Sequence, residues 1–276
     1  MVAKMINQNK NRATRALISD NYENFAKSKR SQVTIFIIIA LMIVVMIAMI
    51  FVIWRKPVIS ISPEADPQAY IEKCTRDSVI KSLDILSPRG GSINPVNYKL
   101  YEEIPRRFLC FNQNYYHSCI NQEPMLIEHI EKEIISYIEP EVKACFSSLK
   151  QELEKRNYEI DEGTIDIETE LKTKKVLVTI NKKFQIKKNE ETREFKQFKA
   201  QIIHPIYDLA NIALEITNQE SKYCNFEYIG HMVFYPQYKI EKFVAGDSAK
   251  IYTITEKSSD KKFVFAVRSC VVPPGF

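Results

Sequence analysis

The sequence has little glycine and none of the short motifs that build the common nucleotide, hydrolase and metal sites. Six glycines occur in 276 residues, and neither G-x-x-x-x-G-K nor G-x-G-x-x-G is present, which excludes the two usual glycine-rich phosphate cradles. G-x-S-x-G, H-E-x-x-H and C-x-x-C are also missing, and the four histidines are scattered. We therefore expect no enzymatic activity, no metal ion and no cofactor.

Charge is absent from one long stretch. No charged residue occurs from Gln32 to Trp54, and the apolar run 33–54 contains no Gly, Pro, Asn or Gln. As a helix these 22 residues would be about 33 Å long, against a hydrocarbon core of roughly 30 Å. A cleaved secretory signal has a shorter apolar region and ends in small residues. The run therefore predicts a transmembrane helix within 32–56 that contacts the lipid bilayer through 33–54.

The excess positive charge of the chain lies entirely before this run. Residues 1–31 contain seven Lys or Arg and two acidic residues, whereas 32–276 contain 32 basic and 32 acidic residues. The positive-inside rule then predicts a cytoplasmic tail, 1–31, and an extracytoplasmic remainder after the helix. Since the remainder is neutral overall, the sequence gives no support for nucleic-acid binding.

The segment around Ser31 and the start of the apolar run resembles a known type of signal peptide. The stretch "KSKRSQVTIFIIIALMIVV" resembles the class III signal peptide of archaeal type IV pilin-like precursors, although Ser31 replaces the commoner Gly or Ala. The resemblance implies that a prepilin-type peptidase cleaves between Ser31 and Gln32 and that the apolar helix stays on the mature chain. The alternative is an uncleaved signal anchor.

The six cysteines all follow the apolar run. An even set confined to the exterior part predicts disulfide bonds, whereas a zinc site would need clustered ligands. Of the 15 possible pairings, the pattern favours a local pair that closes a short loop, a pair between two helices, and a pair that flanks the C-terminal strands. These are Cys110–Cys119, Cys74–Cys145 and Cys224–Cys270.

The remainder predicts an α+β domain, 67–276, behind a proline-bearing spacer, 57–66. In its helical part, 67–157, apolar residues recur at helical spacing after Asp66 and again after Pro124, and Pro140 should kink the second helix or start another. The second stripe comprises Ile127, Ile130, Ile134, Ile138, Val142, Cys145, Leu149 and Leu153.

The mixed part, 158–276, alternates with the period of strands. Three strands are predicted over "TIDIETEL", "KVLVTINKKFQI" and "REFKQFKAQII", then a helix over "HPIYDLANIALEITNQE". Four further strands are predicted over "FEYIGHMVFY", "YKIEKFV", "KIYTITE" and "KFVFAVRSCVV", with "SSDKK" turning between the last two. This order indicates helices packed on antiparallel sheet.

Two groups of residues are candidate sites. "HIEKE" offers only one histidine, so Glu128, Glu131 and Glu133 are expected on the wet face of a helix. Cys270, Arg268 and His231 are the residue types of sortases, but the chain lacks their T-L-x-T-C sequence. His117, His129 and His204 are expected to be ordinary surface or packing residues.

Two functions remain open. The first is a structural or interaction protein of the cell membrane, a pilin-like surface component with self-assembly or envelope protein partners. The second is a monomeric, single-pass, signal-anchored ectodomain that binds an envelope ligand or partner. Pro57 interrupts the anchor helix and favours the second, because a pilin helix often continues into its head.

Overall fold

A computed structural model describes residues 36–49 and 66–273 of the chain. The chain divides into two units, 1–60 and 61–276, and each is described by itself.

In the first unit, residues 36–49 form a helix whose side chains are exposed. Within the described ranges, no helix combines the length and the apolar character that crossing a membrane requires. The rest of the predicted span, 33–35 and 50–54, lies outside the described residues. The junction between Ser31 and Gln32 does so as well.

The second unit is an α+β domain with antiparallel-rich sheets and three disulfides, and its order begins with helices as predicted. Its helical elements are α2 (Pro67–Leu86), the 3-10 turn η1 (Ser87–Arg89), α3 (Leu126–Glu154), α4 (Ile206–Tyr223) and α5 (Tyr228–Phe234). Its strands are β1 (Tyr98–Tyr101), β2 (Ile104–Phe111), β3 (Ile120–Asn121), β4 (Glu159–Glu162), β5 (Asp166–Lys172), β6 (Lys175–Lys188), β7 (Glu191–Ile203), β8 (Tyr238–Val244), β9 (Lys250–Glu256) and β10 (Lys261–Arg268).

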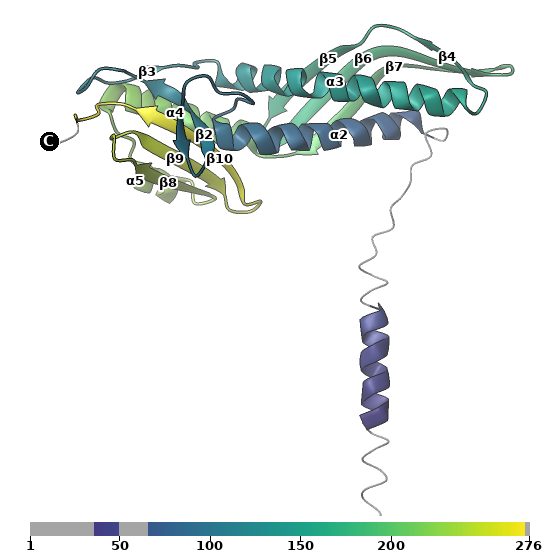
Figure 1. Ribbon diagram of the computed structural model, residues 1–276, viewed down its shortest axis with the longest axis horizontal. Coiled ribbons are helices and arrows are strands. Elements are labelled where there is room, and N and C mark those ends of the chain that lie inside the picture. The colour runs from purple at the N-terminus through teal and green to yellow at the C-terminus, as the bar shows by residue number, and fades with distance from the viewer. Residues whose placement is uncertain (1–35, 50–65, 274–276) are drawn as a thin grey trace, which may run out of the picture. The chain divides into compact units, whose positions relative to one another are not determined.

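Helices α2 and α3 lie side by side along the length of this unit (Figure 1). At one end they cover a four-stranded antiparallel sheet, with α2 against β7 and α3 against β5. Strand β6 is the centre of that sheet: β7 pairs along one edge of it, and β4 and β5 follow one another along the other edge. Burial along β5 alternates strictly, which places one face of the sheet on the helices and the other in solvent.

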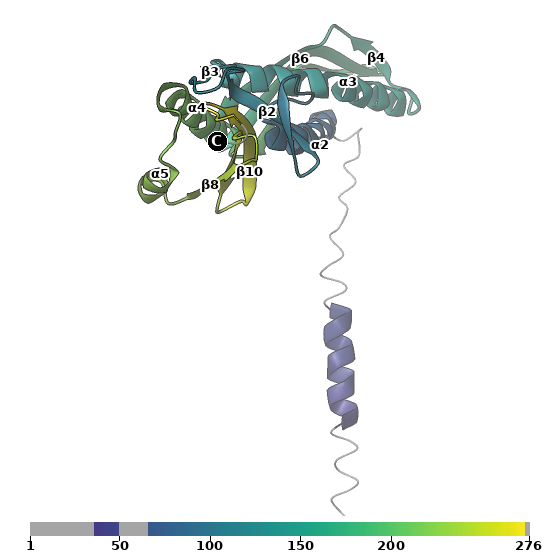
Figure 2. The same cartoon turned by 60° about the vertical axis from the view of Figure 1, so that its left-hand side comes forward.

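A second, six-stranded sheet lies at the other end with α4 and α5 (Figure 2). Its main order is β1-β2-β10-β9-β8, and the pair of β10 with β2 is parallel while the others are antiparallel. The sheet curls until its two edge regions meet. The rings of Tyr101 and Phe243 lie 5.0 Å apart, and Lys99 Nζ lies 2.6 Å from Oδ2 of Asp247.

Local sequence explains where the long helices begin. Asp66 accepts the N–H of Ala69 at 2.9 Å and caps α2, and Pro67 occupies the first turn, where no donor is needed. The predicted stripe of α3 is buried from Ile130 to Leu153, with Ile127 partly buried. Contrary to one alternative, Pro140 starts no second helix, because α3 is continuous through it.

Several expectations on secondary structure were wrong. Residues 228–234 form a helix instead of a strand, because His231 and Met232 turn to the core while Ile229, Val233 and Phe234 face outward, which is a helical spacing. Three strands, β1 to β3, lie within the part expected to be helical. Strand β4 is a fourth member of the sheet for which three strands were predicted.

Candidate functional site

The six cysteines form three disulfides, Cys74–Cys145, Cys110–Cys119 and Cys224–Cys270. These are the pairs that the sequence favours. Within the described residues no cysteine is free. Cys74–Cys145 joins α2 to α3, and Cys224–Cys270 joins the end of α4 to the segment after β10. The bonds therefore hold the two ends of the domain separately.

The sortase-like residues have separate partners. Cys270 is in a disulfide and has no thiolate to use as a nucleophile. Arg268 donates to the backbone oxygen of Asn112 and lies over the ring of Tyr115. The ring of His231 contacts Phe226 and Tyr235 instead. No catalytic constellation follows from these three residues.

A polar cluster joins the loop after α2 to β2 and α3. Oγ of Ser92 lies 2.8 Å from Nε2 of His129, and Nδ1 of that ring lies 3.5 Å from Oε2 of Glu123. Serine, histidine and carboxylate in this order are the arrangement of acyl-transfer enzymes.

Arg107 changes the chemistry of this cluster. Its Nη1 lies 2.6 Å from Nε2 of His129, and its Nη2 donates to Glu123 at 2.9 Å. A guanidinium has donors only, so Nε2 is its acceptor and the lone pair needed by a general base is occupied. Burial first, and Arg107 next, lower the pKa of His129. Ser92 is itself buried, and we interpret the cluster as a clamp on the loop.

The loop held by this clamp comes very close to α3. Gly91 has a φ of +84°, and a Cβ at this position would lie 2.9 Å from Cγ1 of Ile130. The N–H of Ile93 is accepted by Glu133 at 2.9 Å. Glu133 therefore has a structural partner and is not simply part of the wet face.

Glu131 has a similar role. Its Oε1 accepts the N–H of Leu171, on the edge strand β5, at 2.8 Å. Burial is the main reason that its pKa is raised. Of Glu128, Glu131 and Glu133, only Glu128 is exposed as expected.

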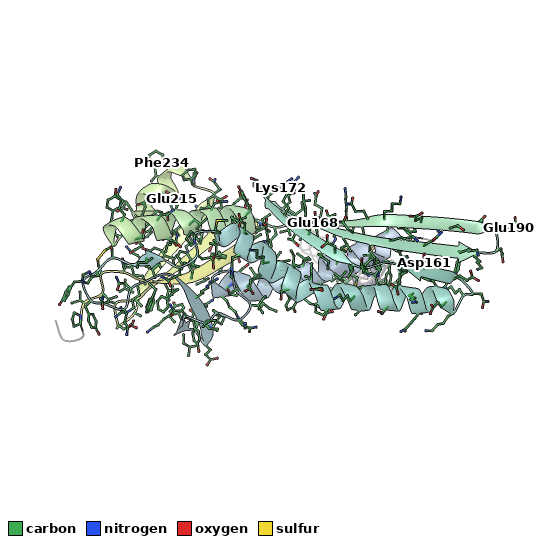
Figure 3. The ribbon with its side chains drawn as sticks, turned by 90° about the horizontal axis from the view of Figure 1, so that it is seen from above. Asp161, Glu168, Lys172, Glu190, Glu215 and Phe234 are labelled. Atoms are coloured by element: carbon green, nitrogen blue, oxygen red, sulfur yellow. A yellow bond between two sulfur atoms is a disulfide. The ribbon has the colours of Figure 1, made fainter. Side chains whose placement is uncertain are left out.

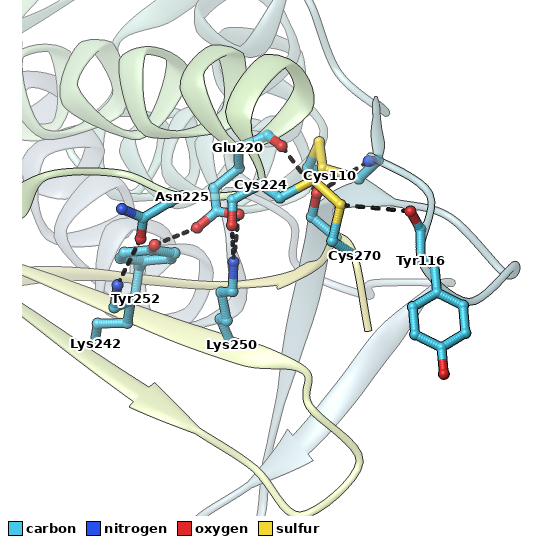
Figure 4. Close-up of polar contacts among 11 residues, drawn as sticks. Cys110, Tyr116, Glu220, Cys224, Asn225, Lys242, Lys250, Tyr252 and Cys270 are labelled. Carbon is cyan, nitrogen blue, oxygen red and sulfur yellow. Dashed lines mark hydrogen bonds and ion pairs between the residues drawn. A yellow bond between two sulfur atoms is a disulfide. The ribbon is translucent and has the colours of Figure 1, made fainter. Parts of the chain in front are cut away.

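A buried ion pair lies beside the C-terminal disulfide (Figure 4). Glu220 on α4 is fully buried, and its Oε2 lies 2.6 Å from Nζ of Lys250 on β9. The hydroxyl of Tyr252 donates to the other oxygen, and burial, followed by Glu220, raises the pKa of that hydroxyl. Lys250 also donates to the backbone oxygen of Cys224. The group has its partners inside the protein and ties α4 to the second sheet.

An open pocket of about 240 Å³ lies where α4, α5 and the start of β8 meet. Its lining includes Asp208 and Glu215 from α4, His231 from α5, Tyr235 directly after α5, and Tyr238 from β8. Nδ1 of His231 lies 3.6 Å from Oε1 of Glu215. Nε2 of His231 is buried and has no partner among the described residues. This is the candidate functional site, because it is open and contains a buried polar group without a partner.

Exposed apolar side chains of α5 lie next to this pocket. Val233 is 73% exposed and Phe234 is 81% exposed, on the same short helix as His231. Exposed apolar residues grouped near a pocket are typical of interaction sites.

No family model, curated protein or solved structure matches this chain in comparisons with known proteins. Within the described residues, no group of three or more His, Cys, Asp or Glu side chains is placed to hold a metal ion.

The sequence pointed to neither the pocket nor the buried pair. From the sequence, His231 is a candidate only beside Cys270 and Arg268, and the segment that contains it is predicted to be a strand. The spacing of Asp208 and Glu215 by seven residues was the available signal, because it places both on one face of a helix.

Proposed function

We propose that the protein is an extracytoplasmic structural or interaction protein, held in the cell membrane by 33–54, with 1–31 on the cytoplasmic side. The observation that carries this proposal is the pairing of all six cysteines in the second unit. Stable disulfides are typical of oxidising exterior compartments. The basic tail before an uncharged run supports the same orientation.

The first unit adds support from burial. The apolar side chains of 36–49 are exposed, for example 69% for Phe36 and 65% for Met42. A helix that is apolar on all sides is typical of a membrane or of the centre of an assembly. We therefore propose that 36–49 belongs to a longer helix that contacts lipid.

We further propose that the chain is processed like a type IV pilin precursor, between Ser31 and Gln32. Cleavage there would remove the net charge of +5 from the N-terminus and leave a neutral chain that begins with the apolar helix. Such a chain could leave the bilayer and enter an assembly, whereas the charges would hold an uncleaved chain in place.

Two experiments test these proposals. N-terminal sequencing of the protein purified from its own membranes tests the processing. Protease added to intact cells tests the orientation. A mature chain that begins at Gln32, and loss of processing in Ser31→Asp, would support the pilin-like proposal. A start at Met1 or Val2 would leave a signal-anchored ectodomain. Protection of 67–276 from external protease would contradict the orientation.

The second candidate is a monomeric ectodomain that binds an envelope ligand. The open pocket beside α5 favours it, because a purely structural subunit needs no such site. We propose no catalytic role for the domain in either case. The occupied lone pair of His129 and the bonded sulfur of Cys270 support that proposal.

A further inference from the structure

We propose that the pocket between α4, α5 and β8 binds the side-chain ammonium group of a lysine on a partner protein. The inference holds whether or not the chain is processed, because all of the residues that it uses lie in the second unit.

The charges of the pocket favour a cation. Its two ionisable side chains from α4, Asp208 and Glu215, are both acidic, and its described lining includes no Lys or Arg. The negative field also reaches the aromatic wall. Burial is the main cause of the raised pKa of Tyr238, and Asp208 is the next.

The acceptors are arranged for a group with several donors. Oδ2 of Asp208 accepts the backbone N–H of Lys174 at 2.9 Å, which fixes the carboxylate and leaves Oδ1 for a ligand. Glu215, whose side chain is 47% exposed, reaches the pocket from two turns further along α4. An ammonium has three donors and no acceptor, so two carboxylates and a ring face suit it.

The rigid side of the pocket is built by α5. The side chain of His231 is only 6% exposed, and its ring lies between those of Phe226 and Tyr235, with centroids 5.5 Å and 4.7 Å away. Its unpartnered Nε2 is an unmet hydrogen-bonding capacity inside this wall. Such a residue is more costly to keep than an apolar one, which points to a role in binding.

The volume of the pocket suits a single side chain better than a drug-sized ligand. Pockets for drug-sized ligands and cofactors measure about 300–1,000 Å³, and this one measures about 240 Å³. The exposed Val233 and Phe234 next to it offer apolar contact to the residues that flank the lysine. A peptide-borne ammonium uses both features, whereas a free small amine uses only the first.

The test uses the full chain in detergent micelles and two probes, N-acetyl-lysine methylamide and N-acetyl-norleucine methylamide. The second probe has a similar aliphatic chain and no ammonium. Saturation-transfer NMR should show contact at the ε-methylene of the lysine probe and little transfer to norleucine. Salt at 0.5 M should weaken the contact, since the pair is open to solvent.

The test variant is Glu215→Gln, which keeps the shape of this half-exposed side chain and removes its negative charge. This substitution should weaken the binding of the lysine probe about three- to fivefold. Glu190→Gln is the matched control, because it makes the same charge change at the opposite end of the unit (Figure 3). Equal transfer to both probes, an equal effect of the two variants, or binding of N-acetylglucosamine in place of lysine would overturn the proposal.

A longer probe tests the protein-borne part of the inference. N-acetyl-Leu-Lys-Leu methylamide should bind several-fold more tightly than the single-residue probe, and Phe234→Ser should remove this gain without changing the single-residue affinity. An unchanged gain in Phe234→Ser would overturn the assignment to a protein partner.

Discussion

His204 lies two residues before the first residue of α4, and its Nδ1 accepts the N–H of Ile206 at 3.2 Å. The residue is buried, and burial, with a smaller effect of Lys261, lowers its pKa to about 4. The imidazole must therefore be neutral to accept this N–H, which is more than the ordinary surface or packing role predicted for His204. A buried neutral histidine makes stability depend on pH.

We predict that His204 contributes to acid sensitivity. The unfolded state binds a proton near pH 6.5, and the folded state resists it until about pH 4. The stabilisation is thus complete above pH 6.5 and is lost as the pH falls towards 4, by an amount on the order of 3 kcal/mol. Urea unfolding at pH 7 and pH 4.5 measures it.

His204→Asn is the matched variant, since asparagine can accept the same N–H and does not titrate. Its free energy of unfolding should fall less than that of the wild type between the two pH values. An identical fall in both proteins would assign the acid sensitivity to other groups.

The buried pair of Glu220 and Lys250 predicts a large effect of a small change. Glu220→Gln leaves the ammonium buried without its counter-charge, which should lower the free energy of unfolding by about 3–5 kcal/mol. Denaturant unfolding at pH 7 measures it. Because replacing both partners of a buried pair by apolar residues is often tolerated, Glu220→Met with Lys250→Met should cost less than the single change. A single variant as stable as the wild type would show that the pair is open to water.

At the scale of elements, the outer edge of β5 is protected by a side chain from α3. The carboxylate of Glu131 takes the N–H of Leu171, which an added strand from another chain would otherwise use. Charged side chains at edge strands are a known protection against such pairing.

We predict that Glu131→Ala opens this edge. The amide of Leu171 should exchange with solvent at least tenfold faster, and stability should fall by about 1 kcal/mol. Amide hydrogen exchange followed by NMR measures the first effect. Glu128→Ala is the control, because it lies on the same helix but is exposed. Equal exchange rates in the two variants would contradict the protective role.

The elements that were predicted correctly are those in which the spacing of apolar residues repeats over a long stretch. Helix α3 carries its stripe over eight turns, and β5 and β6 alternate over their whole lengths, so a few misplaced residues do not obscure the pattern. Helix α5 has seven residues, rich in the types that favour strands, and its fold depends on which of them meet the core. Strands β1 and β3 are short and partly exposed, and β2 has three consecutive buried residues, so these strands do not show the alternation that predicts a strand.

At the scale of the whole molecule, the disulfides differ in the length of chain that they close. Cys110 and Cys119 are 9 residues apart, while Cys74 and Cys145 are 71 apart. In the chain-entropy description these loops correspond to about 3 and about 4 kcal/mol.

We therefore predict that the double variant Cys74→Ala, Cys145→Ala loses about 1–2 kcal/mol more stability than Cys110→Ala, Cys119→Ala. Denaturant unfolding of the two proteins, each with its remaining bonds intact, measures the difference. In the wild type, no cysteine should react with an alkylating reagent before reduction. Modification of all six without reductant would refute the bonds and the exterior location together.

The cysteine pairs could be predicted from the sequence, but the candidate site could not. The cysteine pairs could be proposed because each has few plausible partners within its own segment. The pocket could not, because Glu215 and His231 meet only after α5 has packed beside α4. Polar clusters of this kind depend on tertiary contacts, which carry no short-range pattern.

The parallel pair of β10 with β2 has a consequence for biosynthesis. Ala266 pairs with Phe108, which precedes it by 158 residues, and both strands lie inside the second sheet. At ribosomal speeds of 5–20 residues per second, β10 is synthesised roughly 8–30 s after β2. A chain that enters an exterior compartment during its synthesis must pass this interval with an unfinished sheet, although both cysteines of the Cys74–Cys145 and Cys110–Cys119 pairs have already been made. The second sheet is therefore complete only after β10 has been made, and a product truncated before Lys261 should be recognised as unfinished and degraded.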